Sequence, residues 1–141
     1  DRLIMNSDAV SYYATFDNYM VGQIQGQYII DTLDLENQAG PFTLECTTGD
    51  PGDNNANFFY GGAMDLLQPY IDEGKLVVTS GQTDFATVAT ANWDTANAQS
   101  GMENILSSYY ADGTNLDFFA INNLLCHCAL PPYSTTARIS L

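Results

Sequence analysis

The sequence contains very few basic residues. Only three of its 141 residues are lysine or arginine, against 17 aspartates and glutamates, which gives a formal net charge of −14. A surface of this sign repels phosphate groups, and no cluster of basic residues offsets the repulsion. We therefore expect neither nucleic acid nor an anionic membrane surface as a partner, whereas a neutral small molecule or a cation is compatible with the charge.

Long apolar runs, histidine and cysteine are also scarce. No apolar run approaches the roughly 18 residues that cross a bilayer. The single histidine, His127, stands between Cys126 and Cys128, and Cys46 is the third cysteine. An odd cysteine count does not indicate a disulfide framework, and a structural zinc site needs four ligands at wider spacing. We therefore predict no metal site and, in the absence of a phosphate-binding glycine loop, no cofactor.

Segments rich in β-branched and aromatic residues alternate with segments of helical periodicity. The predicted strands are residues 10–16, 42–49, 75–81 and 116–122. The predicted helices are residues 17–33, 56–68 and 92–110. Strand and helix in alternation favour right-handed crossovers and an α/β fold, namely a doubly wound parallel sheet with helices on both faces.

Two helices carry further local predictions. Asp17 or Asn18 is placed to cap the first helix. Its predicted apolar stripe contains Val21, Ile24 and Tyr28. Pro69 is expected to kink or restart the second helix, because proline lacks a backbone N–H.

The only tryptophan, Trp93, falls where the third helix is predicted to begin, at the carboxyl edge of the sheet. Ligands of open α/β sheets bind outside this edge. An indole there either packs over the core or offers a flat platform to a ligand. The surrounding asparagines and aspartates favour the platform, because the C–H face of a sugar packs on an aromatic ring while its hydroxyls need paired donors and acceptors.

Several long motifs resemble, in the same order, those of the periplasmic sugar-binding proteins of ABC importers. They are DRLI, YYATFDNYMVGQIQGQYI, GDPGDNNANFFYGGAMDLLQPYIDEGKL, SGQTDF and TANWDTANAQSGMENIL. The most similar groups are the xylose, galactose/glucose and multiple-sugar receptors of the type I periplasmic binding protein fold. The resemblance runs from Asp1 to about Asn123 and implies one lobe of that fold, in incomplete form.

The resemblance also implies a division of the chain. Residues 1–18 resemble the end of the first lobe and a crossing segment, and residues 19–123 resemble an α/β sugar-binding lobe. Residues 124–141 depart from the family pattern. Our hypothesis is that this atypical tail comes from a frameshift, a chimaeric junction or vector sequence.

The resemblance implies that six residues contact the sugar. Asp1 and Arg2 would accept from and donate to its hydroxyls, and Trp93 would stack on its ring. The six residues are Asp1, Arg2, Asn55, Trp93, Asn97 and Asn123. Asn54 and Asn57 are less favoured than Asn55, because the register of that loop is ambiguous. The departure of the chain directly after Asn123 weakens the assignment of that residue.

The implied function is non-catalytic binding of a neutral monosaccharide such as xylose, glucose or galactose. In the family, such a receptor works with the membrane subunits of an ABC importer at the periplasmic or extracellular face of the bacterial membrane. Since one lobe supplies about half of the contacts of a closed cleft, we expect weak binding by this chain alone.

Two other classes of function remain open from the residues. A glycoside hydrolase needs two carboxyl groups beside the scissile bond, and four aspartates fall on the predicted binding edge. They are Asp50, Asp53, Asp84 and Asp94. An oligomerising fragment without a ligand is the other class, because an incomplete lobe exposes sheet edges and apolar surface.

Overall fold

The computed structural model describes residues 8–9 and 11–121 of the chain. The helices are α1 (Asn18–Leu33), α2 (Asn54–Asp72), α3 (Phe85–Val88) and α4 (Thr95–Tyr109), with a 3-10 turn, η1 (Ala91–Trp93). The strands are β1 (Phe42–Thr47), β2 (Leu76–Val77) and β3 (Phe118–Ile121).

The three strands are parallel and lie in the order β2-β1-β3. Phe42 of β1 pairs with Leu76 of β2, and Leu44 of β1 pairs with Phe118 of β3. Parallel neighbours require crossover connections, which α2 and α4 supply here. The predicted parallel α/β sheet is confirmed, although its strands are shorter than the apolar segments that predicted them.

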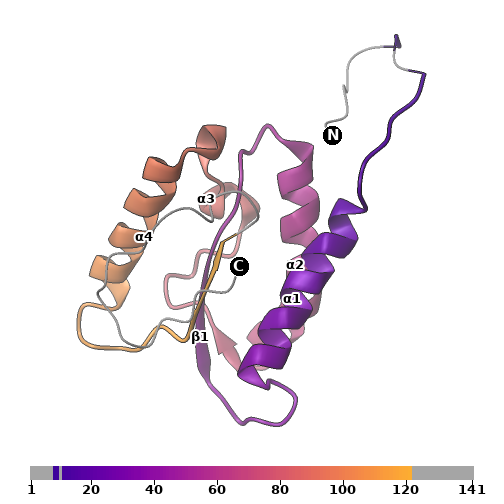
Figure 1. Cartoon of the computed structure of the whole chain (residues 1–141). Coiled ribbons are helices and arrows are strands. Elements are labelled where there is room, and N and C mark those ends of the chain that lie inside the picture. The colour runs from indigo at the N-terminus through magenta and orange to yellow at the C-terminus, as the bar shows by residue number, and fades with distance from the viewer. Residues whose placement is uncertain (1–7, 10, 122–141) are drawn as a thin grey trace.

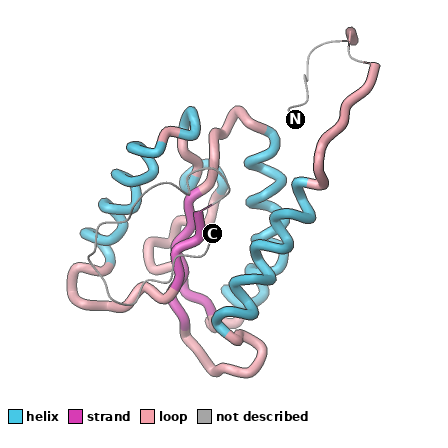
Figure 2. The backbone as a smooth tube through the Cα atoms, viewed as in Figure 1, coloured by secondary structure: helices cyan, strands magenta, loops and turns pink. Residues whose placement is uncertain are grey.

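Helices cover both faces of this sheet. In Figure 1 and Figure 2, α1 and α2 lie side by side on one face, and α4 lies on the other. A strand covered on both faces needs apolar side chains in both directions, which accounts for the near-continuous apolar runs in the sequence. The doubly wound arrangement is therefore confirmed for the described part of the chain.

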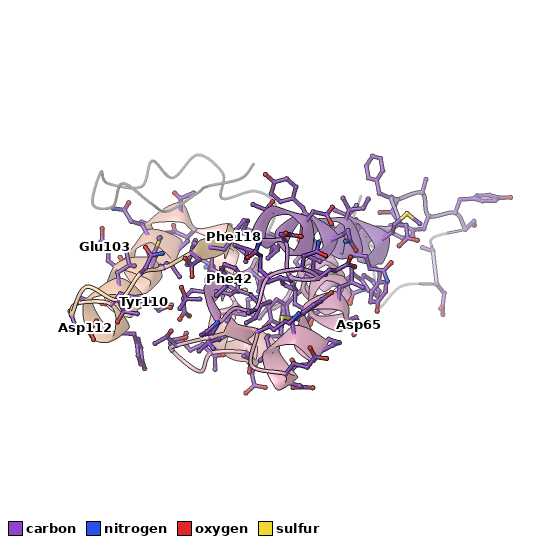
Figure 3. The ribbon with its side chains drawn as sticks, turned by 90° about the horizontal axis from the view of Figure 1, so that it is seen from below. Phe42, Asp65, Glu103, Tyr110, Asp112 and Phe118 are labelled. Carbon is purple, nitrogen blue, oxygen red and sulfur yellow. The ribbon has the colours of Figure 1, made fainter. Side chains whose placement is uncertain are left out.

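Each face of the sheet has its own apolar core. The core beneath α1 and α2 consists of Ile29, Ile30, Leu35, Leu44, Leu67, Leu76 and Phe118. The core beneath α4 consists of Met102, Ile105, Tyr110, Leu116 and Phe119. Adjacent residues of β3 thus serve opposite faces, and Figure 3 shows Phe118 beside Phe42 at the centre of the molecule.

Helices α1 and α2 approach each other through glycines. A Cβ atom built on Gly22 would lie 2.1 Å from the carbonyl oxygen of Phe59, and one on Gly62 would lie 2.2 Å from that of Tyr19. Both distances are shorter than any real Cβ contact, so a side chain at either position would force the helices apart. Because Gly22 and Gly62 lack side chains, the backbones of α1 and α2 can come into direct contact.

This glycine contact overturns the predicted apolar stripe of α1. The helix itself and its cap at Asp17 are confirmed, but its buried face contains the glycines and Ile29 rather than the predicted residues. Ile24 is 62% exposed and Tyr28 is 48% exposed. The stripe was wrong because apolar periodicity alone cannot show which face of a helix will pack by backbone contact.

Three further predictions about elements were wrong. Residues 11–16 contain no strand, and Val10 lies outside the described residues. A strand requires a hydrogen-bonded neighbour, and the described chain offers this segment none. The predicted interruption at Pro69 does not occur, since α2 continues to Asp72 and the proline falls in its last turn. Helix α4 begins at Thr95 rather than at residue 92, because Asn92 and Trp93 both have positive φ.

We expect Gly22→Ala to lower the free energy of unfolding by about 2 kcal/mol, because the added methyl group meets backbone atoms that cannot move aside. Urea unfolding followed by circular dichroism measures the change. Gly101→Ala is the matched control: it is also helical, and no described atom lies within 4 Å of its Cβ position. Equal unfolding midpoints for the two variants would contradict the packing described here.

Candidate functional site

Main-chain hydrogen bonds join the loop after β1 to the segment before η1. The Thr48 N–H donates to the Val88 carbonyl over 2.8 Å, and the Thr90 N–H donates to the Thr48 carbonyl over 3.0 Å. Thr48 and Ala89 thereby form a parallel bridge just beyond β1. The carboxyl edge of the sheet, where ligands of such folds bind, thus continues into this loop and the turn that carries Trp93.

Trp93 lies at this edge and is half-buried. Its Nε1–H donates to a carboxylate oxygen of Asp53 over 3.2 Å. Asp53 is 8% exposed and caps α2, since its other carboxylate oxygen accepts a hydrogen bond from the Asn55 N–H over 3.1 Å. The indole is therefore anchored along its polar edge without being interior.

Asn55 shares this partner with Trp93. Its side-chain oxygen accepts a hydrogen bond from the Asn18 amide over 2.9 Å, which ties the start of α2 to the start of α1. Of the two residues considered beside it, Asn54 is exposed and Asn57 donates to the Asp53 carbonyl over 3.5 Å. The structure thus brings Asn55 and Trp93 together around one carboxylate.

Asn97 lies in the first turn of α4, where Asp94 caps the helix. The Asp94 carboxylate accepts a hydrogen bond from the Asn97 N–H over 2.8 Å, and the Asn97 side chain is exposed. Asn97 lines a groove along α4, and Trp93 is not among the residues that line it. The structure therefore does not place the predicted Asn97 contact and the indole in one cavity.

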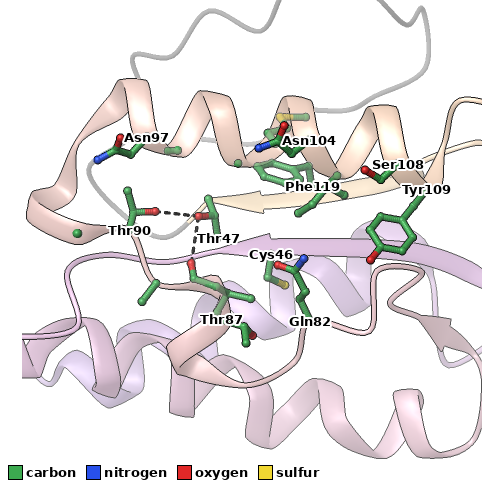
Figure 4. A pocket seen from close by; sticks show the side chains of 17 residues that line it. Cys46, Thr47, Gln82, Thr87, Thr90, Asn97, Asn104, Ser108, Tyr109 and Phe119 are labelled. Atoms are coloured by element: carbon green, nitrogen blue, oxygen red, sulfur yellow. Dashed lines mark hydrogen bonds between the residues drawn. The ribbon is translucent and has the colours of Figure 1, made fainter.

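The groove along α4 has a volume of about 490 Å³. In Figure 4, α4 forms one wall and the segment with Gln82 and Thr87 lies opposite. Phe119 and Thr47 lie between these walls, and the Thr47 hydroxyl is 3.1 Å from the Thr90 hydroxyl. The groove mixes apolar and hydroxyl groups, and Trp93 does not line it.

Several predictions fall on residues that the structure does not describe. Asp1, Arg2, Asn123 and the tail at 124–141 lie outside the described residues. Their assignments, like the division of the chain at residues 18 and 123, remain predictions.

Three of the four aspartates considered for hydrolysis have structural partners. Asp53 and Asp94 cap helices, as described above. The Asp50 carboxylate accepts hydrogen bonds from the Gly52 N–H over 2.7 Å and from the Asn92 N–H. Asp84 precedes α3 and makes no side-chain capping bond. Three of these four carboxylates therefore stabilise helix starts or the turn at Asn92.

Glu45 is a buried structural residue near the candidate site that the sequence patterns did not indicate. It is completely buried in the centre of β1, and its carboxylate accepts hydrogen bonds from the Ser80 N–H over 2.9 Å and the Tyr110 hydroxyl over 2.8 Å. Burial raises the pKa of Tyr110, which keeps this hydroxyl a donor. Glu45 thus holds the loop after β2 and the end of α4 to the sheet. The sequence feature that could have indicated this role is a single carboxylate within a predicted strand.

Among the described residues, no group of three or more histidine, cysteine, aspartate or glutamate side chains is arranged to hold a metal ion. Burial raises the pKa of the Cys46 thiol to about 12. Cys126, His127 and Cys128 lie outside the described residues. No described helix has the length and apolar character needed to cross a bilayer.

Comparison with known proteins gives a consistent family. A family model described as a periplasmic binding protein domain matches residues 1–126. The chain is 56% identical over 112 residues to the multiple sugar-binding periplasmic protein SbpA of Azospirillum brasilense, covering 79% of this chain and 31% of that protein. It is 57% identical over 112 residues to the multiple sugar-binding periplasmic receptor ChvE of Rhizobium radiobacter, covering 79% of this chain and 32% of that one.

A solved structure is also similar. It is an ABC transporter solute binding protein of Clostridium phytofermentans with bound β-D-glucose, 66% identical to this chain, with a TM-score of 0.85. The match covers 89% of this chain and 39% of that protein. The chain spans about a third of the length of the curated relatives above.

We expect the Cys46 thiol to react slowly with iodoacetamide at pH 8, because the thiolate is the nucleophile and burial raises the pKa from 9.0 to about 12. Since folding disfavours the thiolate, the stability that the protonated thiol contributes is present below pH 9 and is lost as the pH rises towards 12. Mass spectrometry on a Cys126→Ser/Cys128→Ser variant measures labelling of Cys46 alone. The unfolded variant in urea is the control, and equal labelling rates in the two states would contradict this burial.

Proposed function

The chain belongs to the periplasmic binding protein domain family, since that family's model matches residues 1–126, and from this premise we propose that it binds a neutral monosaccharide without catalysis. The single observation that carries the proposal is the indole of Trp93. It is half-buried at the carboxyl edge of a parallel sheet, and its Nε1–H is fixed by the Asp53 carboxylate.

The chemistry of this edge suits an uncharged carbohydrate. An aromatic ring offers a flat apolar surface for the C–H face of a sugar ring. The backbone N–H of Asn55 donates to the same carboxylate as the indole, and its side-chain oxygen accepts from the Asn18 amide. A side-chain amide at this place is of the type that exchanges hydrogen bonds with hydroxyl groups. A net charge of −14 does not oppose a neutral ligand, whereas it repels an anionic one.

The relatives support this ligand class. Two of them carry the name multiple sugar-binding, and the similar solved structure contains β-D-glucose. All three are named as receptors, periplasmic proteins or solute binding proteins rather than as enzymes. Together with the structural hydrogen bonds of Asp50, Asp53 and Asp94, these names favour binding over the alternative of glycoside hydrolysis.

The proposed sugar contacts are Asp1, Arg2, Asn55, Trp93, Asn97 and Asn123. Of these, the indole has the firmest support from the geometry described above. Recognition is assigned to residues 19–123, with residues 1–18 as the end of a neighbouring lobe. We further propose a periplasmic or outward-facing location and delivery of the sugar to the membrane subunits of an ABC importer, in keeping with the names of the relatives.

One apolar feature bears on a second candidate, association between copies. Four apolar side chains spaced by four residues are exposed before and along α1. They are Phe16 at 81%, Met20 at 54%, Ile24 at 62% and Tyr28 at 48%. An exposed stripe of this kind favours self-association, which could also bring two binding edges together.

We expect the 141-residue chain to bind glucose, xylose or galactose with a dissociation constant in the millimolar range. A micromolar site corresponds to about −8 kcal/mol, and half of that energy leaves about −4 kcal/mol. Trp93→Leu should weaken binding about tenfold through loss of the stacking surface. Calorimetry measures both values, and Tyr109→Leu, an exposed aromatic residue of the groove, is the matched control.

Sedimentation velocity on the same samples reports whether copies associate. Micromolar affinity in a monomer would contradict the expected weak binding, and an equal loss in the Tyr109→Leu control would contradict the assignment to Trp93. Turnover of chromogenic glycosides that disappears in an Asp53→Asn/Asp94→Asn variant would instead establish the hydrolase alternative.

A further inference from the structure

We propose that Gly49 and Asp53 are positioning residues that hold the indole of Trp93 in one orientation, with one ring face against the backbone and the opposite face left for a sugar. The inference rests on the proposed function, because it concerns the same aromatic platform. It adds which residues fix the platform and which face of it is used.

Gly49 lies directly against the ring. A Cβ atom built on Gly49 would lie 2.0 Å from Cη2, 2.2 Å from Cζ2 and 2.3 Å from Cζ3 of Trp93. If the Cβ position lay in the plane of the ring, beyond its outer edge, Cζ2 and Cζ3 would be much farther from it than Cη2, the atom between them. The nearly equal distances therefore place the glycine over the face of the six-membered ring.

Position 49 requires glycine because a side chain would not fit beside the indole, not because of an unusual backbone conformation. The glycines with positive φ are Gly40, Gly74, Gly81 and Gly113. Gly49 is not among them, so an alanine there would suit the backbone, and the atoms nearest to its Cβ would be those of the indole. The Gly49 carbonyl also accepts a hydrogen bond from the Thr90 N–H over 3.0 Å, which fixes the glycine to the turn that carries Trp93.

Asp53 fixes the polar edge of the indole. One of its oxygens accepts from the Trp93 Nε1–H and the other from the Asn55 N–H, so its side chain is held by the start of α2 while it holds the ring. With 8% of its surface exposed, it has little freedom to rotate away. Contacts at a face and at the polar edge together define the plane of the ring.

The turn itself carries strain that these contacts stabilise. Asn92 has φ of 57° and Trp93 has φ of 53°, and a bulky residue rarely adopts this left-handed region. The Asp50 carboxylate accepts a hydrogen bond from the Asn92 N–H, within the same loop that supplies Gly49 and Asp53. Strain that surrounding contacts maintain is characteristic of positions where a side chain must point in a particular direction.

An indole fixed before the ligand arrives loses little rotamer freedom on binding. Release of the ring should therefore weaken sugar binding, by about two- to tenfold in Kd, even though neither Gly49 nor Asp53 needs to touch the sugar. Pre-organisation of this kind depends on supporting residues rather than on the contact residue alone.

The test uses Trp93 as the sole source of indole fluorescence in the chain. Gly49→Ala should displace the ring. Asp53→Ser should release its N–H edge, because serine keeps the α2 cap but is too short to reach the indole. We expect both variants to increase quenching by acrylamide in the absence of sugar. Asp53→Asn has a single acceptor oxygen for the two N–H groups that the carboxylate holds, so we expect its quenching to lie between those of the wild type and Asp53→Ser.

Gly101→Ala, with no described atom within 4 Å of its Cβ position, is the matched control and should quench like the wild type. Far-UV circular dichroism confirms that each variant is folded, and Asp53→Ser serves if Gly49→Ala does not fold. Unchanged quenching in folded Gly49→Ala and Asp53→Ser would overturn the proposal.

A glucose titration followed by the same fluorescence separates the two claims. Increased quenching together with two- to tenfold weaker binding supports the positioning role. Increased quenching in the variants, with no response of the wild type to glucose, xylose or galactose, leaves the ring contacts established and overturns the sugar platform. Increased quenching with unchanged affinity overturns the positioning role while sugar binding stands.

Discussion

The candidate site depends on a short parallel pairing that continues β1 beyond its last residue. Thr48 exchanges main-chain hydrogen bonds with Val88 and Thr90, and this brings the loop at 48–53 against the turn that carries Trp93. The contacts of Gly49 and Asp53 with the indole are possible only because the two segments are held at this distance. Glu45 supports the same arrangement from within the sheet, because it anchors the loop after β2.

Much of the fold could be predicted because local patterns and global packing agree. The parallel sheet follows from alternating apolar strands and helices, and the α1 boundaries follow from Asp17 and helical periodicity. Local patterns failed where a tertiary contact decides. The buried face of α1 is set by Gly22 against the backbone of α2, and residues 11–16 have high β propensity but no neighbouring strand among the described residues.

The site shows the same division. The position of Trp93 at the carboxyl edge could be predicted from topology, and the structure confirms it. The bond from Trp93 to Asp53 joins residues 40 positions apart, so neither spacing nor periodicity could reveal it. The sequence also could not show that Asn97 lines a separate groove along α4. A titration with sugar therefore has to distinguish the indole from this groove.

The most direct measurement is an ¹H–¹⁵N NMR titration of the chain with glucose, because the chain contains a single indole N–H. If Trp93 is the platform, its Nε1–H resonance shifts saturably while the amides of Asn104, Ile105, Ser108 and Tyr109 in the groove remain unchanged. Shifts confined to these four groove residues, with the indole resonance unmoved, would contradict the account.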